Sequence, residues 1–318
     1  MYLGRFSFSV PYNYKVRLGV LDVGSNSVHL EVIDGHRSAP PIPQKSFKHD
    51  IKLTDYLDGE GNISEAGITT LLETITQSTS EAEKLQLDEL LAFATSAIRE
   101  ARNCDSVIEK VQKQTGVDLQ VLTGDEEAQF TFLAARRWFG WSVGDLLVFD
   151  IGGGSLEIAR GIEEAASFTT SIMLGAGRLT RSFLQGDPFT EKSLRKLDEF
   201  IVESLKPLRE PLSDYKNGIA VGTSKTFRTL DKLCAEFQPK KHFGITKESL
   251  DELANGLAKM SFKERKNLPG VSETRANQIV AGALVARQVM AQFNLSMIQT
   301  CPWALREGIV LRRMDWLS

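Results

Sequence analysis

Two short stretches of this chain of 318 residues carry the same arrangement of Asp, Gly and Ser after an apolar run. Each predicts a buried strand that delivers a carboxylate to a tight turn, whose backbone N–H groups and hydroxyl can bind a phosphate. An Asp-x-Gly turn is also ordinary in hairpins, but two matched copies favour a duplicated phosphate site. The residues concerned are Asp22, Gly24, Ser25, Asn26 and Ser27 in the first copy and Asp150, Gly152, Gly153, Gly154 and Ser155 in the second.

Acidic residues supply the candidates for chemistry. Asp125, Glu126 and Glu127 follow a predicted strand that ends at Leu122, and ligands of open α/β sheets bind beyond the carboxyl ends of strands. These three side chains also suit the start of any helix, where negative charge is favoured. Their position favours a further role, in which a carboxylate orients or deprotonates a water molecule for attack on phosphorus.

A divalent cation is expected beside the two turns. Asp22, Asp150 and Glu157 could hold it, because Mg²⁺ prefers carboxylate oxygens and bridges to substrate phosphates. The alternative for Glu157 is a strand residue that faces solvent.

Basic side chains are needed to balance a polyanionic ligand. Arg99 follows a predicted strand, whereas Arg178 and Lys225 each follow a glycine turn, and we expect all three to converge on one cleft. Arg136 and Arg137 are weaker candidates, and a surface position is the alternative for Arg99. The sequence has neither G-x-x-x-x-G-K-[ST] nor G-x-G-x-x-G, which argues against P-loop and dinucleotide-binding proteins.

The bulk composition is that of a soluble globular protein, with 42% hydrophobic and 25% charged residues. A net charge of −3 disfavours a general nucleic-acid binder. No apolar run is long enough to cross a bilayer, and residues 1–16 do not follow the pattern of a secretory signal. We therefore expect a cytoplasmic protein with no membrane partner. Three scattered cysteines and four unpaired histidines argue against a disulfide framework or a histidine-based metal centre.

Strands alternate with helices along the chain, which predicts an α/β protein with a mixed or parallel sheet. We expect one domain over residues 1–134 and another over 135–318, with the final helix able to pack back on the first, and both glycine turns on a shared cleft. Strands are predicted in 17–34 (two), 90–94, 119–122, 146–150, 156–160, 167–172 and 218–221. Helices are predicted at 64–85, 105–114, from 125, and at 190–205, 225–236, 247–258, 274–291 and 304–316.

Taken together, the motifs resemble the exopolyphosphatase and guanosine pentaphosphate phosphohydrolase family, within the actin-like superfamily of acetate kinase, sugar kinases and Hsp70. The resemblance implies a two-domain, ribonuclease H-like fold with the active site in the cleft between domains. Residues 301–308 and the run Arg136-Arg137-Trp138 further resemble short actinobacterial members. The stretches that carry the resemblance are 21–27, 94–99, 124–128, 149–157, 269–275 and 301–308.

The resemblance also implies roles for single residues. Glu127 would activate water, Asp150 and Glu157 would bind Mg²⁺ or Mn²⁺, and Arg99 would contact the terminal phosphates. The implied reaction is release of orthophosphate from the end of linear polyphosphate, and the family also favours a homodimer. The remaining phosphate-binding candidates are Gly24, Ser25, Asn26, Ser27, Gly152, Gly153, Gly154, Ser155, Gly177, Arg178 and Lys225.

Two departures from the family pattern bear on substrate choice. Long members carry a further C-terminal helical domain, and its lack here predicts a preference for short polyphosphate. Asn277 stands where many members have Asp, outside the expected catalytic set. Three alternatives stay open: hydrolysis of pppGpp, binding of (p)ppGpp or polyphosphate without turnover, and an ATPase or kinase of the same superfamily. Thr223 after Gly222 argues against the last, because adenosine loops there usually have paired glycines.

Overall fold

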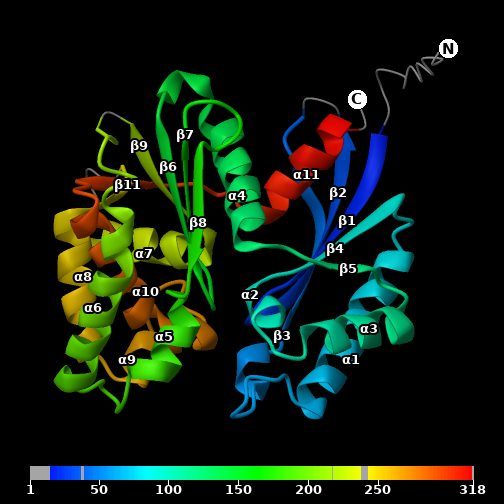
Figure 1. The fold of residues 1–318 in the computed structure, drawn as a ribbon, viewed down its shortest axis with the longest axis horizontal. Coiled ribbons are helices and arrows are strands. Elements are labelled where there is room, and N and C mark those ends of the chain that lie inside the picture. The colour runs from blue at the N-terminus through cyan, green and yellow to red at the C-terminus, as the bar shows by residue number, and fades with distance from the viewer. Residues whose placement is uncertain (1–14, 37–38, 217, 238–242, 317–318) are drawn as a thin grey trace.

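The computed structural model describes residues 15–36, 39–216, 218–237 and 243–316 and shows two α/β halves side by side (Figure 1). Most of the N-terminal stretch in which we predict no secretory signal lies outside these residues. Within the described ranges, no helix is both long and apolar enough to span a membrane.

The first half is built on a five-stranded sheet in the order β3-β2-β1-β4-β5. Strands β1 and β2 form an antiparallel pair in which Asp22 lies opposite His29, and β4 and β5 continue the sheet in parallel with β1. The strands are β1 (Lys15–Val23), β2 (Ser27–His36), β3 (Pro43–Asp50), β4 (Glu89–Ala94) and β5 (Leu119–Val121).

The second half repeats this order with one strand added at the edge, β10-β11-β9-β6-β7-β8. Asp150 on β6 lies opposite Glu157 on β7, the same register position that Asp22 and His29 occupy in the first sheet. The repeat confirms that the two glycine turns connect equivalent strand pairs. The strands are β6 (Leu146–Ile151), β7 (Leu156–Gly161), β8 (Phe168–Ile172), β9 (Ile219–Thr223), β10 (Ile245–Thr246) and β11 (Met297–Thr300).

Helices α1 (Glu65–Glu83) and α3 (Cys104–Thr115) cover one face of the first sheet, with the 3-10 turn η1 (Leu53–Tyr56) and the short α2 (Ser96–Arg99) beside them. The Ser64 side chain accepts from the Gly67 N–H at 3.3 Å and so caps α1. Ile68, Leu71 and Ile75 lie one helical turn apart and are buried against the strands.

The corresponding face of the second sheet carries a larger helical layer. Its central helix is α10 (Glu273–Gln292). Small and branched apolar side chains lie on nearly every side of this helix, so neighbouring helices pack around it and most of its length is buried. The helices of this layer are α5 (Ala176–Phe183), α6 (Glu191–Leu205), α7 (Ser224–Phe237), α8 (Lys247–Lys259), α9 (Phe262–Lys266) and α10 (Glu273–Gln292).

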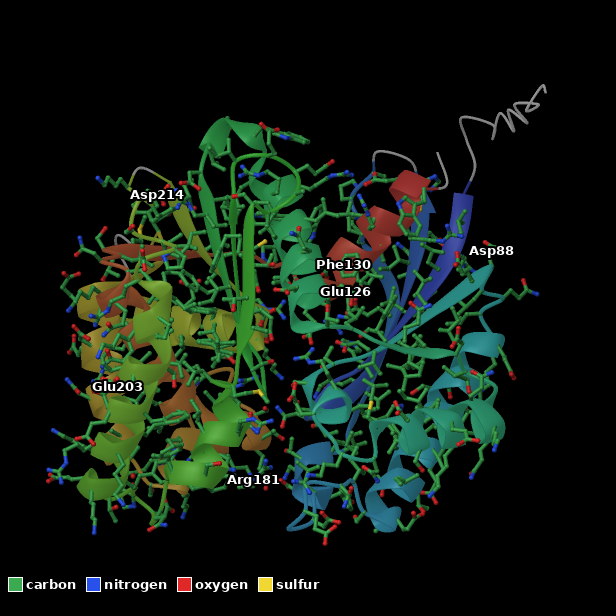
Figure 2. The ribbon with its side chains drawn as sticks, in the orientation of Figure 1. Asp88, Glu126, Phe130, Arg181, Glu203 and Asp214 are labelled. Carbon is green, nitrogen blue, oxygen red and sulfur yellow. The ribbon has the colours of Figure 1, made fainter. Side chains whose placement is uncertain are left out.

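Two helices cross between the halves. Helix α4 (Gly124–Phe139) follows β5 but packs on the second sheet, whereas α11 (Leu305–Trp316), at the end of the chain, packs on β1 and β2 of the first. They touch each other closely, since a methyl group on Gly308 would lie 1.9 Å from the Phe130 carbonyl oxygen. Figure 2 places Phe130 on α4 beside α11. The predicted boundary at residue 134 thus falls inside a helix shared by both halves.

The structure also contains strands that the sequence analysis missed. β3 lies where a Pro-rich loop leads into a polar sequence, and its residues are mostly exposed because it is an edge strand paired with β2 alone. β10 and β11 lie between predicted helices, where no strand was predicted, and β11 forms through its parallel pairing with the distant β9.

Candidate active site

The two glycine turns have the same internal hydrogen bond and face each other across the gap between the halves. The Gly24 N–H donates to the Ser27 carbonyl, and the Gly152 N–H donates to the Ser155 carbonyl, each at 3.0 Å. A methyl group on Gly153 would lie 2.7 Å from Asn26 Nδ2. A methyl group on Gly154 would lie 2.3 Å from Ser96 Oγ, so Gly153 and Gly154 are needed for close approach between the halves rather than for a positive φ.

The start of α5 holds the second turn from behind. The Ala176 N–H donates to the Gly152 carbonyl at 3.0 Å, and the Arg178 N–H donates to the Gly153 carbonyl at 2.9 Å. Arg178 Nε donates to the Gly154 carbonyl at 3.1 Å. A turn whose carbonyl groups are held on one side can present its N–H groups to a ligand on the other.

A cavity of about 390 Å³ lies between the halves and contains both turns. This volume is within the range of about 300–1,000 Å³ that is usual for ligand pockets. Of the predicted phosphate-binding residues, the cavity lining includes Gly24, Ser25, Asn26, Ser27, Gly152, Gly153, Ser155 and Lys225. Gly154 of the second turn lies outside that lining, as do Gly177 and Arg178, which belong to α5 behind the turn.

Carboxylates from five elements reach this cavity: Asp22, Asp50, Glu127, Asp150 and Glu157. Asp150 accepts a hydrogen bond from Thr223 Oγ1 at 3.0 Å, and Glu157 accepts one from Ser171 Oγ at 2.8 Å. Burial raises the pKa of Asp22 and of Asp150. Burial and the charge of Asp150 raise the pKa of Glu157 to about 7. Such crowding of buried acids requires a cation or shared protons.

Glu127 is buried near the start of α4, with 7% of the residue exposed. A capping box between Thr123 and Glu126 fixes this end of the helix, which leaves the Glu127 side chain to face the cavity. Arg99 is paired with Glu127 and also donates to the Leu122 carbonyl at 2.9 Å. Burial, and then the neighbouring Glu157, raise the pKa of Glu127 well above 4.5, while Arg99 opposes this shift.

The chemistry of the acidic set fits a hard divalent cation. Among the described residues, no three His, Cys, Asp or Glu side chains are grouped tightly enough to form a preformed metal cage, so Asp22, Asp150 and Glu157 are not such a cage. Mg²⁺ typically uses one or two carboxylates and takes its other ligands from water and substrate phosphates. Asp150 and Glu157, opposite each other on β6 and β7, can supply that pair.

The cations that line the cavity differ from those predicted. Lys225 does line it, whereas Arg99 is turned to Glu127 and Arg178 lies behind the second turn. The remaining basic lining residues, each from a different segment, are Lys48, Arg228, Arg275 and Arg306. Burial and the charge of Arg228 lower the pKa of Arg275 to about 10. Lys48 is paired with Asp50 and Arg306 lies 3.4 Å from Glu31, so the positive charge that attracts an anionic ligand comes mainly from Lys225, Arg228 and Arg275.

The weaker prediction for Arg136 and Arg137 is wrong. Arg136 is fully buried and donates to the carbonyls of Gly144 and Gly161, each at 2.8 Å, so it joins α4 to the second sheet. Arg137 pairs with Glu164 and Asp315. Both residues therefore stabilise the fold, away from the cavity.

Ser224 is a further cavity residue that sequence analysis did not single out. Its φ is 65°, which is rare for a residue other than glycine, and its Oγ donates to the Ile151 carbonyl at 3.2 Å. Such strained residues concentrate at functional sites.

Comparison with known proteins places this architecture in a family. The model of the Ppx/GppA phosphatase family matches residues 32–316, and the chain belongs to that family. It is 44% identical over 305 residues to "Exopolyphosphatase 1" of Mycobacterium tuberculosis, an alignment that covers 94% of this chain and 89% of the relative.

Solved structures agree on the fold. A crystal structure of an exopolyphosphatase from Cytophaga hutchinsonii matches with a TM-score of 0.85 and 24% identity, covering 94% of this chain and 98% of that one. The Ppx/GppA family member of Aquifex aeolicus matches with a TM-score of 0.79 and 23% identity, covering 96% and 99%. The predicted two-lobed actin-like fold is confirmed.

Proposed function

We propose that the protein is an exopolyphosphatase, which releases orthophosphate from the end of linear polyphosphate. The observation that carries this proposal is the cavity itself, where two equivalent glycine turns from related halves meet among buried carboxylates and clustered cations. The relative at 44% identity bears the same activity in its name. The product is inorganic phosphate, because the acceptor is water.

The position of each residue in the cavity indicates its role in the reaction. The glycine turns and the basic lining bind the phosphate chain, and the terminal unit is expected between the two turns. Glu127 orients the attacking water and accepts its proton, for which a raised pKa is favourable at neutral pH. Arg99 positions the Glu127 carboxylate through their ion pair and does not itself bind phosphate.

A bound Mg²⁺ or Mn²⁺ would be held by Asp150 and Glu157 and would neutralise charge on the phosphate being transferred. It would also relieve the repulsion among the buried acids. Asp22 lies on the facing half, where the charge of Asp150 contributes to the rise in its pKa, so it is the candidate for a further contact.

A substrate panel tests this function. Phosphate release is measured with tripolyphosphate, long polyphosphate, pppGpp and ATP, each with Mg²⁺ and with EDTA, for the wild type and for Glu127→Gln. We expect release from polyphosphate that needs the metal and falls at least about 100-fold in the variant. Equal rates in both proteins would refute the role of Glu127, and a clear preference for pppGpp or ATP would refute the assignment of substrate.

A further inference from the structure

A second cavity, of about 410 Å³, lies beside the first. Asn26 and Thr274 line both. The second cavity is formed by η1 and the residue before it in the first half and by α5, α9 and α10 in the second. The lining residues that concern its chemistry are Lys52, Thr54, Asp55, Thr180, Arg181, Glu273, Asn277 and Gln278.

A pair of side-chain amides separates the two spaces. Asn26 Nδ2 donates to Gln278 Oε1 at 3.2 Å, and Gln278 Nε2 donates back to Asn26 Oδ1 at 3.0 Å. The pair joins the first glycine turn to α10 of the other half. Because Asn26 borders both cavities and Gln278 borders the second, the closed pair lies in the wall between them.

A second contact between the halves borders the same cavity. Arg181 Nη1 donates to the Thr54 carbonyl at 2.8 Å and lies 3.9 Å from Asp55 Oδ1. Figure 2 shows Arg181 at the lower end of the gap, where α5 approaches the first half. The second cavity is thus bounded by an amide pair toward the first cavity and by an arginine contact elsewhere.

The lining has two basic and two acidic side chains, but the acidic ones are neutralised by nearby cations, so the cavity can still accept a polyanion. Both acidic residues of the lining have a cation nearby, since Asp55 lies near Arg181 and Glu273 pairs with Lys266 at 2.8 Å. Lys52 contributes an exposed ammonium group, and the hydroxyls of Thr54 and Thr274 and the Asn277 amide can donate to phosphate oxygens, whereas the Thr180 hydroxyl donates to the Ala176 carbonyl.

We propose that the second cavity binds the distal phosphates of a polyphosphate chain whose end lies in the first cavity, and that the Asn26–Gln278 pair is the gate between them. This inference rests on the proposed exopolyphosphatase function. A chain that fits within the first cavity leaves the gate closed. A longer chain must break both amide hydrogen bonds to extend, so the gate penalises long substrates and Gln278 sets the preference for chain length.

The test is the ratio of kcat/KM for long polyphosphate to kcat/KM for tripolyphosphate, both with Mg²⁺. Gln278→Ala removes the gate and should raise this ratio by about tenfold. Lys52→Gln removes a cation from the second cavity and should lower the ratio by about threefold or more. Gln288→Ala is the control, because Gln288 lies on the same helix but bonds Asp198 at 2.8 Å, and it should leave the ratio unchanged.

Several outcomes would overturn the inference. If Gln278→Ala and Lys52→Gln change both kcat/KM values by one common factor, the second cavity is no subsite, while phosphate release by the wild type still supports the proposed function. A wild type that releases no phosphate from either substrate refutes both. Should Gln278→Ala fail to fold by circular dichroism, Gln278→Asn, which shortens the amide side chain, replaces it with the same expected rise.

Discussion

Gly175 is the position where the addition of one methyl group should separate activity from stability most clearly. Its φ of −70° and ψ of 141° suit any residue, so alanine strains no backbone angle there. The added carbon would instead lie 2.2 Å from the Gly154 carbonyl carbon and 2.4 Å from the Ser155 nitrogen. Nonbonded carbons prefer about 3.5–4.0 Å, so the second glycine turn must move by more than about 1 Å.

The consequences of that movement differ in size. Overpacking costs about 1–3 kcal/mol of folding free energy, which this chain should survive. A displacement of about 1 Å in a phosphate-binding turn should lower the turnover rate by about 100-fold. We therefore expect Gly175→Ala to fold, to melt a few degrees lower, and to lose nearly all phosphate release from tripolyphosphate.

Gly256→Ala is the matched control. Gly256 lies inside α8, and an added methyl group meets nothing within 4 Å. Alanine should raise the free energy of unfolding by about 0.5–1 kcal/mol through helix propensity and leave turnover unchanged. The assays are steady-state phosphate release and thermal unfolding by calorimetry. Full activity of Gly175→Ala would refute the argument that the second turn is held at a functional position by contact with α5.

Three further outcomes are expected. Arg99→Ala removes the cation that lowers the pKa of Glu127, so this pKa should rise further. We expect kcat to fall and the acidic limb of the pH profile of kcat to move to higher pH. A rise in KM alone would contradict the role of Arg99 in positioning Glu127. Burial, and then nearby acidic charge, raise the pKa of Glu31 from 4.5 to about 7, so the fold should lose about 3 kcal/mol as pH rises through this interval. Urea unfolding of Glu31→Gln should show a flatter pH dependence, and an unchanged one would contradict this account. Arg136→Leu removes the hydrogen-bond donor of the buried Gly144 and Gly161 carbonyls. The free energy of unfolding, measured by denaturant titration, should fall by about 3–5 kcal/mol.

Local patterns in the sequence were sufficient for most of the fold. The helix predicted at 64–85 is found at Glu65–Glu83, because its apolar stripe and its cap are properties of consecutive residues. β3 was missed because an edge strand needs no apolar alternation, and β11 because four residues become a strand only beside the distant β9. Pairing of this kind leaves little trace in the local sequence.

The same distinction applies to the site. Asp22, Asp150 and the glycines were found because each turn is a contiguous motif. Lys48 and Arg306 were missed, since they come from an edge strand and a terminal helix that only the assembled fold brings together. For Arg178 the sequence shows a cation beside a glycine turn, but only the structure shows that its guanidinium supports that turn from behind.

The exchange of helices between the halves has a consequence for how the chain acquires its structure. Val310 and Met314 of α11 cover Val16, Leu18 and Val20, so the outer face of the first sheet stays bare until residues 305–316 have left the ribosome. Domains usually fold in order as synthesis proceeds, yet here β1 packs on a helix that lies about 300 residues later in the chain. The first sheet can therefore complete its apolar packing only after residues 305–316 have been synthesised.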